Sequence, residues 1–336
     1  MISEKRTSSQ GRTAPRDRTT WHLVALLLLL VAVALVVPRV SGAAIVIAIN
    51  VLLYAGWATS WDLLGGWTGQ VSLGHAAFVG LGAYTVALFA QRLDLGLWVS
   101  VPIGALFCAL LALGWGAMTF RLRGSYFVLS TIAVAEILRL VAINETWLTG
   151  GAQGIFIFSI PRLLGLDVFE RSTQLFMALF FFALVLCVTL FVSRGRLGYR
   201  MRAVREDEEA AQAAGINPQR VKLTAFALSG ALTGLGGAFY AVYLSFLEPH
   251  DIFFLPLSVQ IALTAIIGGR GTIWGPFAGA LLLVLSREMF RGVFDQANLL
   301  IYGVLILVVV LFAPRGMLGE LARAAVRRRY AGDSRG

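Results

Sequence analysis

The sequence contains ten long apolar runs separated by short polar connections, and this pattern restricts the possible fold more than any other feature. The runs cover residues 21–37, 43–64, 73–90, 97–120, 126–143, 173–193, 221–246, 254–268, 273–290 and 297–313. A helix needs about 20 predominantly apolar residues to cross a bilayer, and the runs are of that order. Of the 336 residues, 58% are hydrophobic and only 14% are charged. The sequence therefore predicts an all-α polytopic membrane protein with about ten transmembrane helices.

The connections between the runs carry their basic residues unevenly. Arginine and lysine concentrate in both tails, at Arg121 and Arg123, in the 194–222 loop and at Arg270. Basic connections lie on the cytoplasmic side of membrane proteins. Ten spans place all of these segments on one side, and both termini in the cytoplasm. The 144–172 connection then lies on the outer, periplasmic side.

This topology divides the chain into three parts. We expect a disordered basic cytoplasmic tail over residues 1–20, a transmembrane domain over 21–318 and a second basic cytoplasmic tail over 319–336. The run Trp21–Val37 also has the length of a signal-peptide core, followed by small residues at 40–43. The topology requires that this run stays in the protein, so we expect no cleavage.

The 194–222 loop contains a pattern that predicts a short helix on the cytoplasmic side. Glu209-Ala210-Ala211 is followed after three residues by Gly215, and arginines flank the segment on both sides. A short helix held there can be gripped by a soluble partner. The alternative is a solvated charged linker without such a role.

A second informative stretch is Leu63–Tyr84, where glycines alternate with small polar residues at membrane depth. The glycines include Gly65, Gly66, Gly69 and Gly74, and the polar side chains include Gln70, Ser72 and His75. Exposed backbone is tolerated in a bilayer only where protein or a water-filled cavity covers it. One interpretation is a discontinuous helix that lines a substrate passage. The other is close helix packing through small residues, and for His75 alone a hydrogen-bonded packing role is favoured.

Similar glycine-rich pieces occur at Ser229–Tyr240 and at 268–280, which includes Gly268, Gly269, Gly275 and Pro276. Pro276 is expected to end or kink a helix.

Charged residues are rare inside the predicted spans. Glu136 and Arg139 are three residues apart and therefore share one face of a helix. A structural ion pair is favoured over a direct substrate role. Asp62, at the end of its span, is expected to lie at the membrane interface.

Several function classes lack their motifs. The sequence has no phosphate-binding G-x-x-x-x-G-K-[ST] motif, no HExxH and no CxxC, and its two cysteines, Cys108 and Cys187, fall in apolar runs. We therefore expect no metal, no cofactor and no catalytic residues. The formal charge of +10 resides in tails and loops, which fits contact with membrane lipid rather than with nucleic acid.

Four motifs together resemble the branched-chain amino-acid ABC transporter permeases of the LivH/LivM family, and the LivM-type subunits most closely. They are Leu64-Gly65-Gly66 with Gly69-Gln70-Val71-Ser72-Leu73-Gly74-His75-Ala76-Ala77-Phe78, Arg123-Gly124-Ser125-Tyr126-Phe127, Glu209-Ala210-Ala211 to Gly215-Ile216-Asn217, and Gly268-Gly269 with Gly271-Thr272 and Gly275-Pro276. The likeness extends over residues 43–318. The sequence departs from the general ABC pattern after Gly215, where the usual Ile-x-Leu-Pro ending is missing, so the length of the docking helix is open.

The resemblance implies a multi-pass permease of the bacterial inner membrane. Its partners would be a second homologous permease subunit, two cytoplasmic ABC ATPases that hydrolyse the ATP, and a periplasmic or lipid-anchored substrate-binding protein. The implied ATPase-coupling residues are Glu209, Ala210, Ala211, Gly215, Ile216 and Asn217. The residues expected along the translocation path are Gln70, Ser72, His75, Phe78 and Tyr84.

The implied function is import of branched-chain, hydrophobic amino acids by alternating access. Urea or short amides are alternative substrates within the same family. An ion-driven secondary transporter is the alternative from another class, but it predicts essential charges in the spans, and Glu136 and Arg139 are nearly the only such pair. A membrane-embedded enzyme lacks a catalytic constellation.

Overall fold

The computed structural model describes residues 41–121, 124–157 and 167–293, together with Leu26, Ala32 and Gly303. Its elements, in chain order, are α2 (Gly42–Gly65), α3 (His75–Leu93), α4 (Leu97–Thr119), α5 (Ser125–Asn144), α6 (Thr146–Thr149), η1 (Gly151–Gln153), β1 (Ile155–Phe156), α7 (Arg171–Arg194), α8 (Arg196–Glu206), α9 (Glu208–Ala213), α10 (Pro218–Leu244), β2 (Phe246–Leu247), α11 (Pro249–Ile252), α12 (Leu255–Gly269) and α13 (Gly275–Val293). The predicted all-α architecture is confirmed, with one two-residue strand pair as its only sheet in these ranges.

Seven helical segments of the described chain are long and apolar enough to cross a membrane. They are Gly42–Gly65, His75–Leu93, Leu97–Thr119, Ser125–Asn144, Arg171–Arg194, Pro218–Leu244 and Pro249–Gly269. An eighth predicted run, 273–290, forms α13, but the last turns of this helix carry Arg287, Glu288 and Arg291. The predicted runs 21–37 and 297–313 and both tails lie outside the described residues. The total of ten spans therefore stays a prediction.

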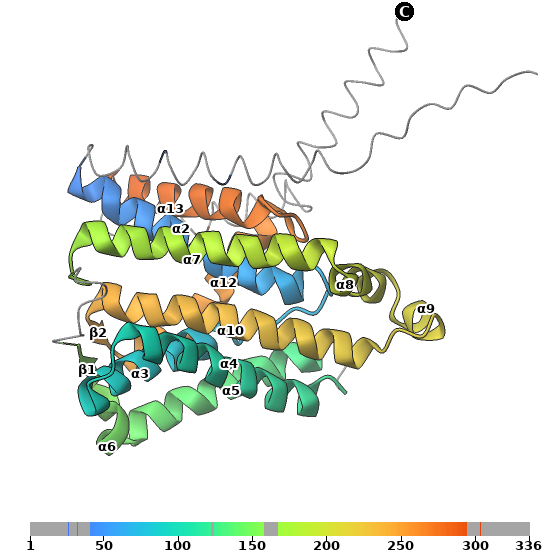
Figure 1. The fold of residues 1–336 in the computed structure, drawn as a ribbon, viewed down its shortest axis with the longest axis horizontal. Helices are drawn as coiled ribbons and strands as arrows, with labels where there is room; N and C mark the ends of the chain where they lie inside the picture. Colours follow the sequence, from blue (N-terminus) through green and yellow to red (C-terminus); the bar gives the residue numbers. More distant parts are fainter. Residues whose placement is uncertain are drawn as a thin grey trace, which may run out of the picture.

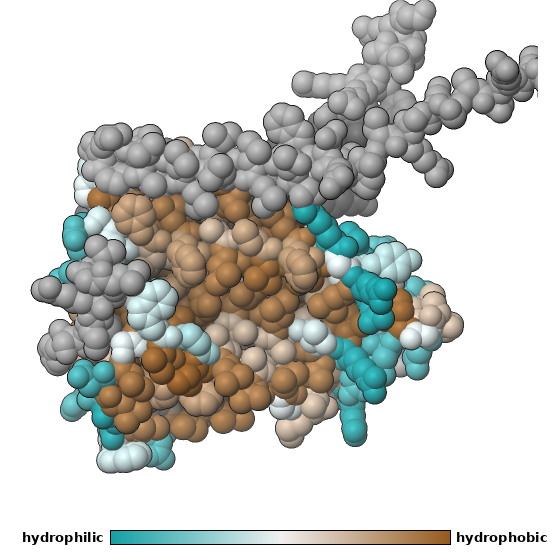
Figure 2. Space-filling view, in the orientation of Figure 1, coloured by the Kyte–Doolittle hydropathy of each residue, from teal (hydrophilic) through white to brown (hydrophobic). Residues whose placement is uncertain are grey.

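The long helices run side by side along the longest axis of the molecule (Figure 1). Helices α8 and α9 lie at one end, and α6, β1 and β2 lie at the opposite end. An apolar band separates these two ends, and polar side chains gather most densely around α8 and α9 (Figure 2). The predicted basic 194–222 loop and the predicted outer connection 144–172 thus fall at opposite ends of one bundle.

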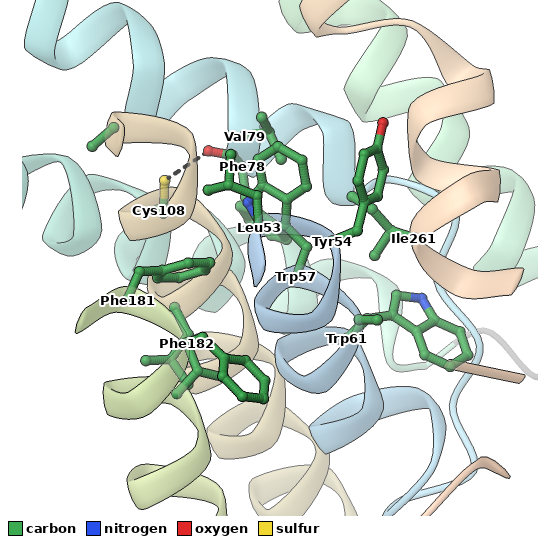
Figure 3. Packing of buried hydrophobic residues seen from close by; sticks show 14 of the residues in the cluster. Leu53, Tyr54, Trp57, Trp61, Phe78, Val79, Cys108, Phe181, Phe182 and Ile261 are labelled. Carbon is green, nitrogen blue, oxygen red and sulfur yellow. Dashed lines mark hydrogen bonds between the residues drawn. The ribbon is translucent and has the colours of Figure 1, made fainter. Parts of the chain in front are cut away.

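Helix α10 packs against α2, α3 and α4 in the centre of the bundle. Glycines allow this close approach: a Cβ atom on Gly82 of α3 would collide with the carbonyl oxygen of Gly234 on α10. The Ser229–Tyr240 stretch is thus an unbroken part of α10, where its glycines serve packing. Large aromatic side chains, among them Trp57, Trp61 and Phe181, fill the space that the glycines leave (Figure 3).

The predicted outer connection, 144–172, contains α6 and η1 and the strand β1. Strand β1 pairs antiparallel with β2, and Ile155 is opposite Leu247. Helix α6 is a single turn of four residues at the start of this connection. Residues 158–166 of the connection lie outside the described ranges.

Candidate functional site

The candidate site is at the end of the bundle that carries α8 and α9, and it begins with the start of α9. The Asp207 carboxylate oxygen Oδ1 accepts hydrogen bonds from the backbone N–H groups of Glu209 and Ala210, both at 2.9 Å. An aspartate at this position satisfies donors that have no partner inside the helix. The ammonium group of Lys222 on α10 lies 2.6 Å from the Glu208 carboxylate and ties the short helix to the bundle.

The end of α9 depends on a glycine. Gly215 has φ +82°, a left-handed conformation that residues with a side chain rarely adopt. This turn lets the Ile216 N–H donate to the Ala211 carbonyl at 3.0 Å, a typical way to close a helix. The Asn217 side chain then caps α10 by accepting from the Arg220 N–H at 3.0 Å. Helix α9 has six residues, and its part in docking stays a prediction.

Helix α9 presents almost all of its surface outward. Ala211 is its one buried residue, at 5% exposure. A groove of about 670 Å³ lies beside it, lined by Gln70, Phe120, Arg121, Gly124, Glu208, Glu209, Gln212, Gly215, Ile216, Asn217, Pro218, Gln219 and Lys222. A second hollow between α8 and α9 contains the exposed ring of Tyr199. This end of the molecule therefore offers a projecting helix between two concave surfaces.

The glycine-rich segment 66–74 interrupts the helices as predicted, because α2 ends at Gly65 and α3 begins at His75. Gly69 has φ +76°, which permits the turn. Side chains from other parts of the bundle satisfy the freed backbone groups: Trp61 Nε1 donates to the Ser72 carbonyl at 2.7 Å, and the Leu73 N–H donates to Thr131 Oγ1 at 3.0 Å. Such pairing is what non-helical backbone at membrane depth requires.

His75 lies in the core of the bundle and is fully buried. Its Nε2 is 2.8 Å from Ser229 Oγ, and the Ser229 hydroxyl donates to the Ser60 carbonyl at 2.6 Å. The Ser229 oxygen therefore accepts from His75, which places the imidazole proton on Nε2. The other nitrogen, Nδ1, is buried without a partner among the described residues. The hydrogen-bonded packing role that was favoured for this histidine fits these contacts.

The residues predicted along a translocation path occupy three levels of the bundle. Gln70 lines the groove beside α9. Ser72, His75 and Phe78 are fully buried, and the Phe78 ring packs against His75 and against neighbouring aromatic rings. Tyr84 stacks on Phe253, nearer the opposite end. Gln70 and Ser72 precede α3, whereas His75, Phe78 and Tyr84 lie on it. The role of these residues in a path stays a prediction.

Asp62, which was expected to lie at the membrane interface, is buried inside the protein near the end of α2, at 1% exposure. Both of its carboxylate oxygens accept from the Gly271 N–H, at 2.9 Å each. The carboxylate thus joins the end of α2 to the loop between α12 and α13, where glycines supply the left-handed turns. No local sequence signal indicates this contact, because the two residues are 209 positions apart.

Arg205 on α8 completes the same junction. Its Nη1 donates to the Gly66 carbonyl at 2.7 Å, and the neighbouring Arg202 guanidinium lies over the Trp67 ring at 5.5 Å from the ring centroid. From the sequence, these arginines are recognisable only as members of a basic cluster. The structure connects them to the glycine-rich break.

Pro276 neither ends nor kinks a helix, contrary to expectation. It lies in the first turn of α13, which begins at Gly275. A proline is tolerated there because the first N–H groups of a helix have no partner inside it. The preceding helix, α12, ends at Gly269, so Gly268 and Gly269 close one helix and Gly275 opens the next.

The seven candidate spans define a polytopic membrane protein. Within the described ranges, no group of three His, Cys, Asp or Glu residues is placed to hold a metal ion. The family model for the permease component of branched-chain amino acid transport systems matches residues 43–312. The chain therefore belongs to this family of permeases, as the motifs indicated, and is a multi-pass protein of the bacterial inner membrane. Members of the family are transport subunits, not catalytic ones.

Curated relatives agree with this assignment. The high-affinity branched-chain amino acid transport system permease protein LivM of Escherichia coli is 33% identical, over 88% of this chain and 74% of the relative. The LivH permease protein of the same organism is 24% identical, over 80% of this chain and 91% of the relative. The nucleoside ABC transporter permease protein NupC of Lactococcus lactis is 27% identical, over 66% and 72%. No solved structure matches the chain significantly.

Proposed function

We propose that this chain is one permease subunit of an ATP-binding-cassette importer, and that it moves branched-chain amino acids into the cytoplasm by alternating access. The observation that carries the proposal is α9, an exposed, capped helix projecting from the arginine-rich end of a bundle that belongs to this permease family. In this proposal, that end faces the cytoplasm, as its arginines favour. A cytoplasmic ATPase subunit grips α9 between the two grooves beside it.

The contacts of α8 supply a route from this grip to the membrane. Helix α9 follows directly on α8, and Arg205 of α8 holds the Gly66 carbonyl. Gly66 adjoins Asp62, which holds Gly271. A movement of α9 therefore reaches both glycine-rich breaks through side chains rather than through a continuous helix. In the alternating-access model, such movement opens and closes the passage along α3.

The proposed substrate follows the relatives. LivM and LivH bear branched-chain amino acid transport in their names, and a passage lined by Phe78 and Tyr84 with Gln70 and Ser72 suits an apolar side chain with a polar head group. The similar NupC protein is named for nucleosides rather than for amino acids. The relatives disfavour an ion-driven mechanism and do not favour urea or amides. The remaining partners in this proposal are a second permease subunit, two ATPases and a periplasmic or lipid-anchored binding protein.

The proposal is tested by co-purification of the ATPase subunits with a tagged chain after joint expression. Glu209→Arg places a positive charge on the exposed face of α9 and is expected to abolish capture, as is Gly215→Pro. Glu145→Arg makes the same charge change at an exposed position at the opposite end of the bundle and serves as the control. Retention of the ATPases by both α9 variants would refute the docking site.

A second measurement tests the class of transporter. Vesicles that contain this chain alone are expected not to concentrate leucine, whereas the complete complex with ATP and binding protein is expected to do so. Accumulation by the chain alone would refute the proposal.

A further inference from the structure

Helix α5 is the least covered span of the described bundle. Only 22% of its apolar stretch is buried, against 67% for α3 and α10. It lies at the edge of the bundle, on the side away from α2 and α13 (Figure 1). Its uncovered surface nevertheless carries a charged pair, Glu136 and Arg139, which the proposed function leaves unused.

The pair is held in a defined geometry. Arg139 Nε donates to Glu136 Oε2 at 2.8 Å, and Nη2 donates to Oε1 at 2.5 Å. The third nitrogen, Nη1, lies 3.1 Å from His250 Nδ1 on α11. Because a guanidinium only donates, Nδ1 of His250 is the acceptor and its proton is on Nε2. Two neighbours thus fix the direction of the guanidinium.

Hydrogen-bonding capacity remains on both members of the pair. A guanidinium has five N–H groups, and the bonds above use three of them. One N–H on Nη1 and one on Nη2 have no partner among the residues that the structure describes. Two such groups form a fork that matches a carboxylate. The Glu136 side chain, half exposed at 50%, keeps free lone pairs that can accept from an ammonium group.

The depth of the pair argues against a lipid-facing position. Glu136 lies eleven residues beyond the start of α5, which corresponds to roughly 17 Å along a helix that rises about 1.5 Å per residue. The whole helix is about 30 Å long, close to the thickness of the hydrocarbon core. A charge at this depth is costly in lipid and usually faces protein or a water-filled cavity. The uncovered face of α5 therefore faces an aqueous passage or a protein surface.

Aliphatic side chains flank the pair on the same face. Leu129 and Ala133 lie seven and three residues before Glu136, and Leu140 lies four residues after it. The side chains of Leu129 and Leu140 are exposed. Positions with these spacings form one stripe along a helix. The surface thus combines a donor fork, a carboxylate and an aliphatic border.

We infer that Glu136 and Arg139 form a binding site for the head group of an aliphatic zwitterionic amino acid. The substrate carboxylate takes the free N–H groups of Arg139, its ammonium group contacts Glu136, and its side chain lies on the aliphatic stripe. This inference rests on the proposed function, names its substrate class and places a contact with that substrate on the uncovered face of α5. Uncharged cargo such as urea lacks both groups that the pair recognises.

The inference is tested on the complete transporter in nanodiscs with a diazirine analogue of leucine. Illumination of the wild type is expected to label peptides of α5, and excess leucine is expected to abolish the label, whereas excess urea is not. Arg139→Gln and Glu136→Gln should each lower the labelling of α5 about tenfold or more, since each removes a charge-assisted contact. Glu145→Gln removes a carboxylate at the end of the same helix and should leave the label unchanged.

The other outcomes separate this site from the alternatives. Label that never appears on α5, while ATP-driven leucine uptake proceeds, would overturn the site and leave the proposed function intact. Loss of the second permease subunit from both glutamine variants would identify the pair as a subunit contact and would also overturn the site. If the wild-type complex does not concentrate leucine at all, the proposed function fails and the inference fails with it.

Discussion

The contact between Arg205 and the Gly66 carbonyl gives the most specific prediction about transmission between the ATPase and the membrane. The change is Arg205→Gln, which removes the guanidinium and leaves a shorter side chain. A hydrogen bond from a charged donor contributes about 1.5–3 kcal/mol. Because each 1.4 kcal/mol is about a factor of ten, the linked arrangement of α8 and the glycine-rich break should become about 10- to 150-fold less favourable. Coupling through this contact cannot exceed that amount.

The expected result is uncoupling rather than loss of assembly. Helix α9 keeps its cap from Asp207 and its ion pair between Glu208 and Lys222, so the ATPases should still bind and hydrolyse ATP. Leucine uptake per ATP hydrolysed should fall about tenfold or more. Both quantities are measured in the same proteoliposomes, as accumulated labelled leucine and released phosphate. The control is Arg220→Gln, which removes an equal charge from an exposed position at the same end of the molecule.

Two results would refute this reasoning. Wild-type uptake per ATP in Arg205→Gln would show that the contact transmits nothing. A loss of ATPase binding in the same variant would show that Arg205 acts on assembly instead.

Two further substitutions test the roles of the glycines. Gly114 provides the common control, because a Cβ added there meets nothing within 4 Å. Gly82→Val should push α3 away from the Gly234 carbonyl and lower the melting temperature of the purified protein, because overpacking typically costs about 1–3 kcal/mol. The control Gly114→Val should leave the melting curve unchanged. An unchanged melting curve for Gly82→Val would contradict the packing argument. Gly215→Ala should weaken ATPase capture up to about thirtyfold, since a residue with a Cβ in the left-handed conformation costs about 1–2 kcal/mol. If Gly215→Ala and Gly114→Ala bound the ATPases with equal affinity, the turn at Gly215 would not be needed for docking.

The element pattern was predictable from the sequence because hydropathy and glycine placement are local signals. The break between Gly65 and His75 and the turn at Gly215 both follow from residues within a few positions of each other. The burial of Asp62 inside the protein and its hydrogen-bond partner were not predictable, because Asp62 accepts from the backbone N–H of Gly271, 209 residues away. The same limit applies to Arg205, which the sequence shows only as one of several arginines.

Glycine content alone did not distinguish packing from helix breaking. The stretch 229–240 has as many glycines for its length as 63–84, yet it stays helical within α10. The difference lies in the neighbouring helices. Gly230 and Gly234 lie close to α3 and α4, so α10 keeps its own helical hydrogen bonds and also gains packing contacts with these helices. Segment 66–74 instead has Trp61, Thr131 and Arg205 within reach, and these side chains replace the helical hydrogen bonds.

These two uses of glycine suggest where the bundle can deform. Helices α3 and α10 approach so closely at Gly82 and Gly234 that neither can slide without steric clash, which favours movement of the two helices as one body. The breaks at 66–74 and 269–275 are packed as tightly, since a Cβ on Gly66 would meet Gly271 N at 2.5 Å and one on Gly74 would meet the Thr131 carbonyl oxygen at 2.4 Å. They differ from the α3–α10 contact because the side chains of Trp61, Asp62 and Arg205 hold several of their backbone groups. In the proposed mechanism, a displacement of α8 therefore reaches both breaks through these side-chain contacts, and Asp62 connects the two breaks.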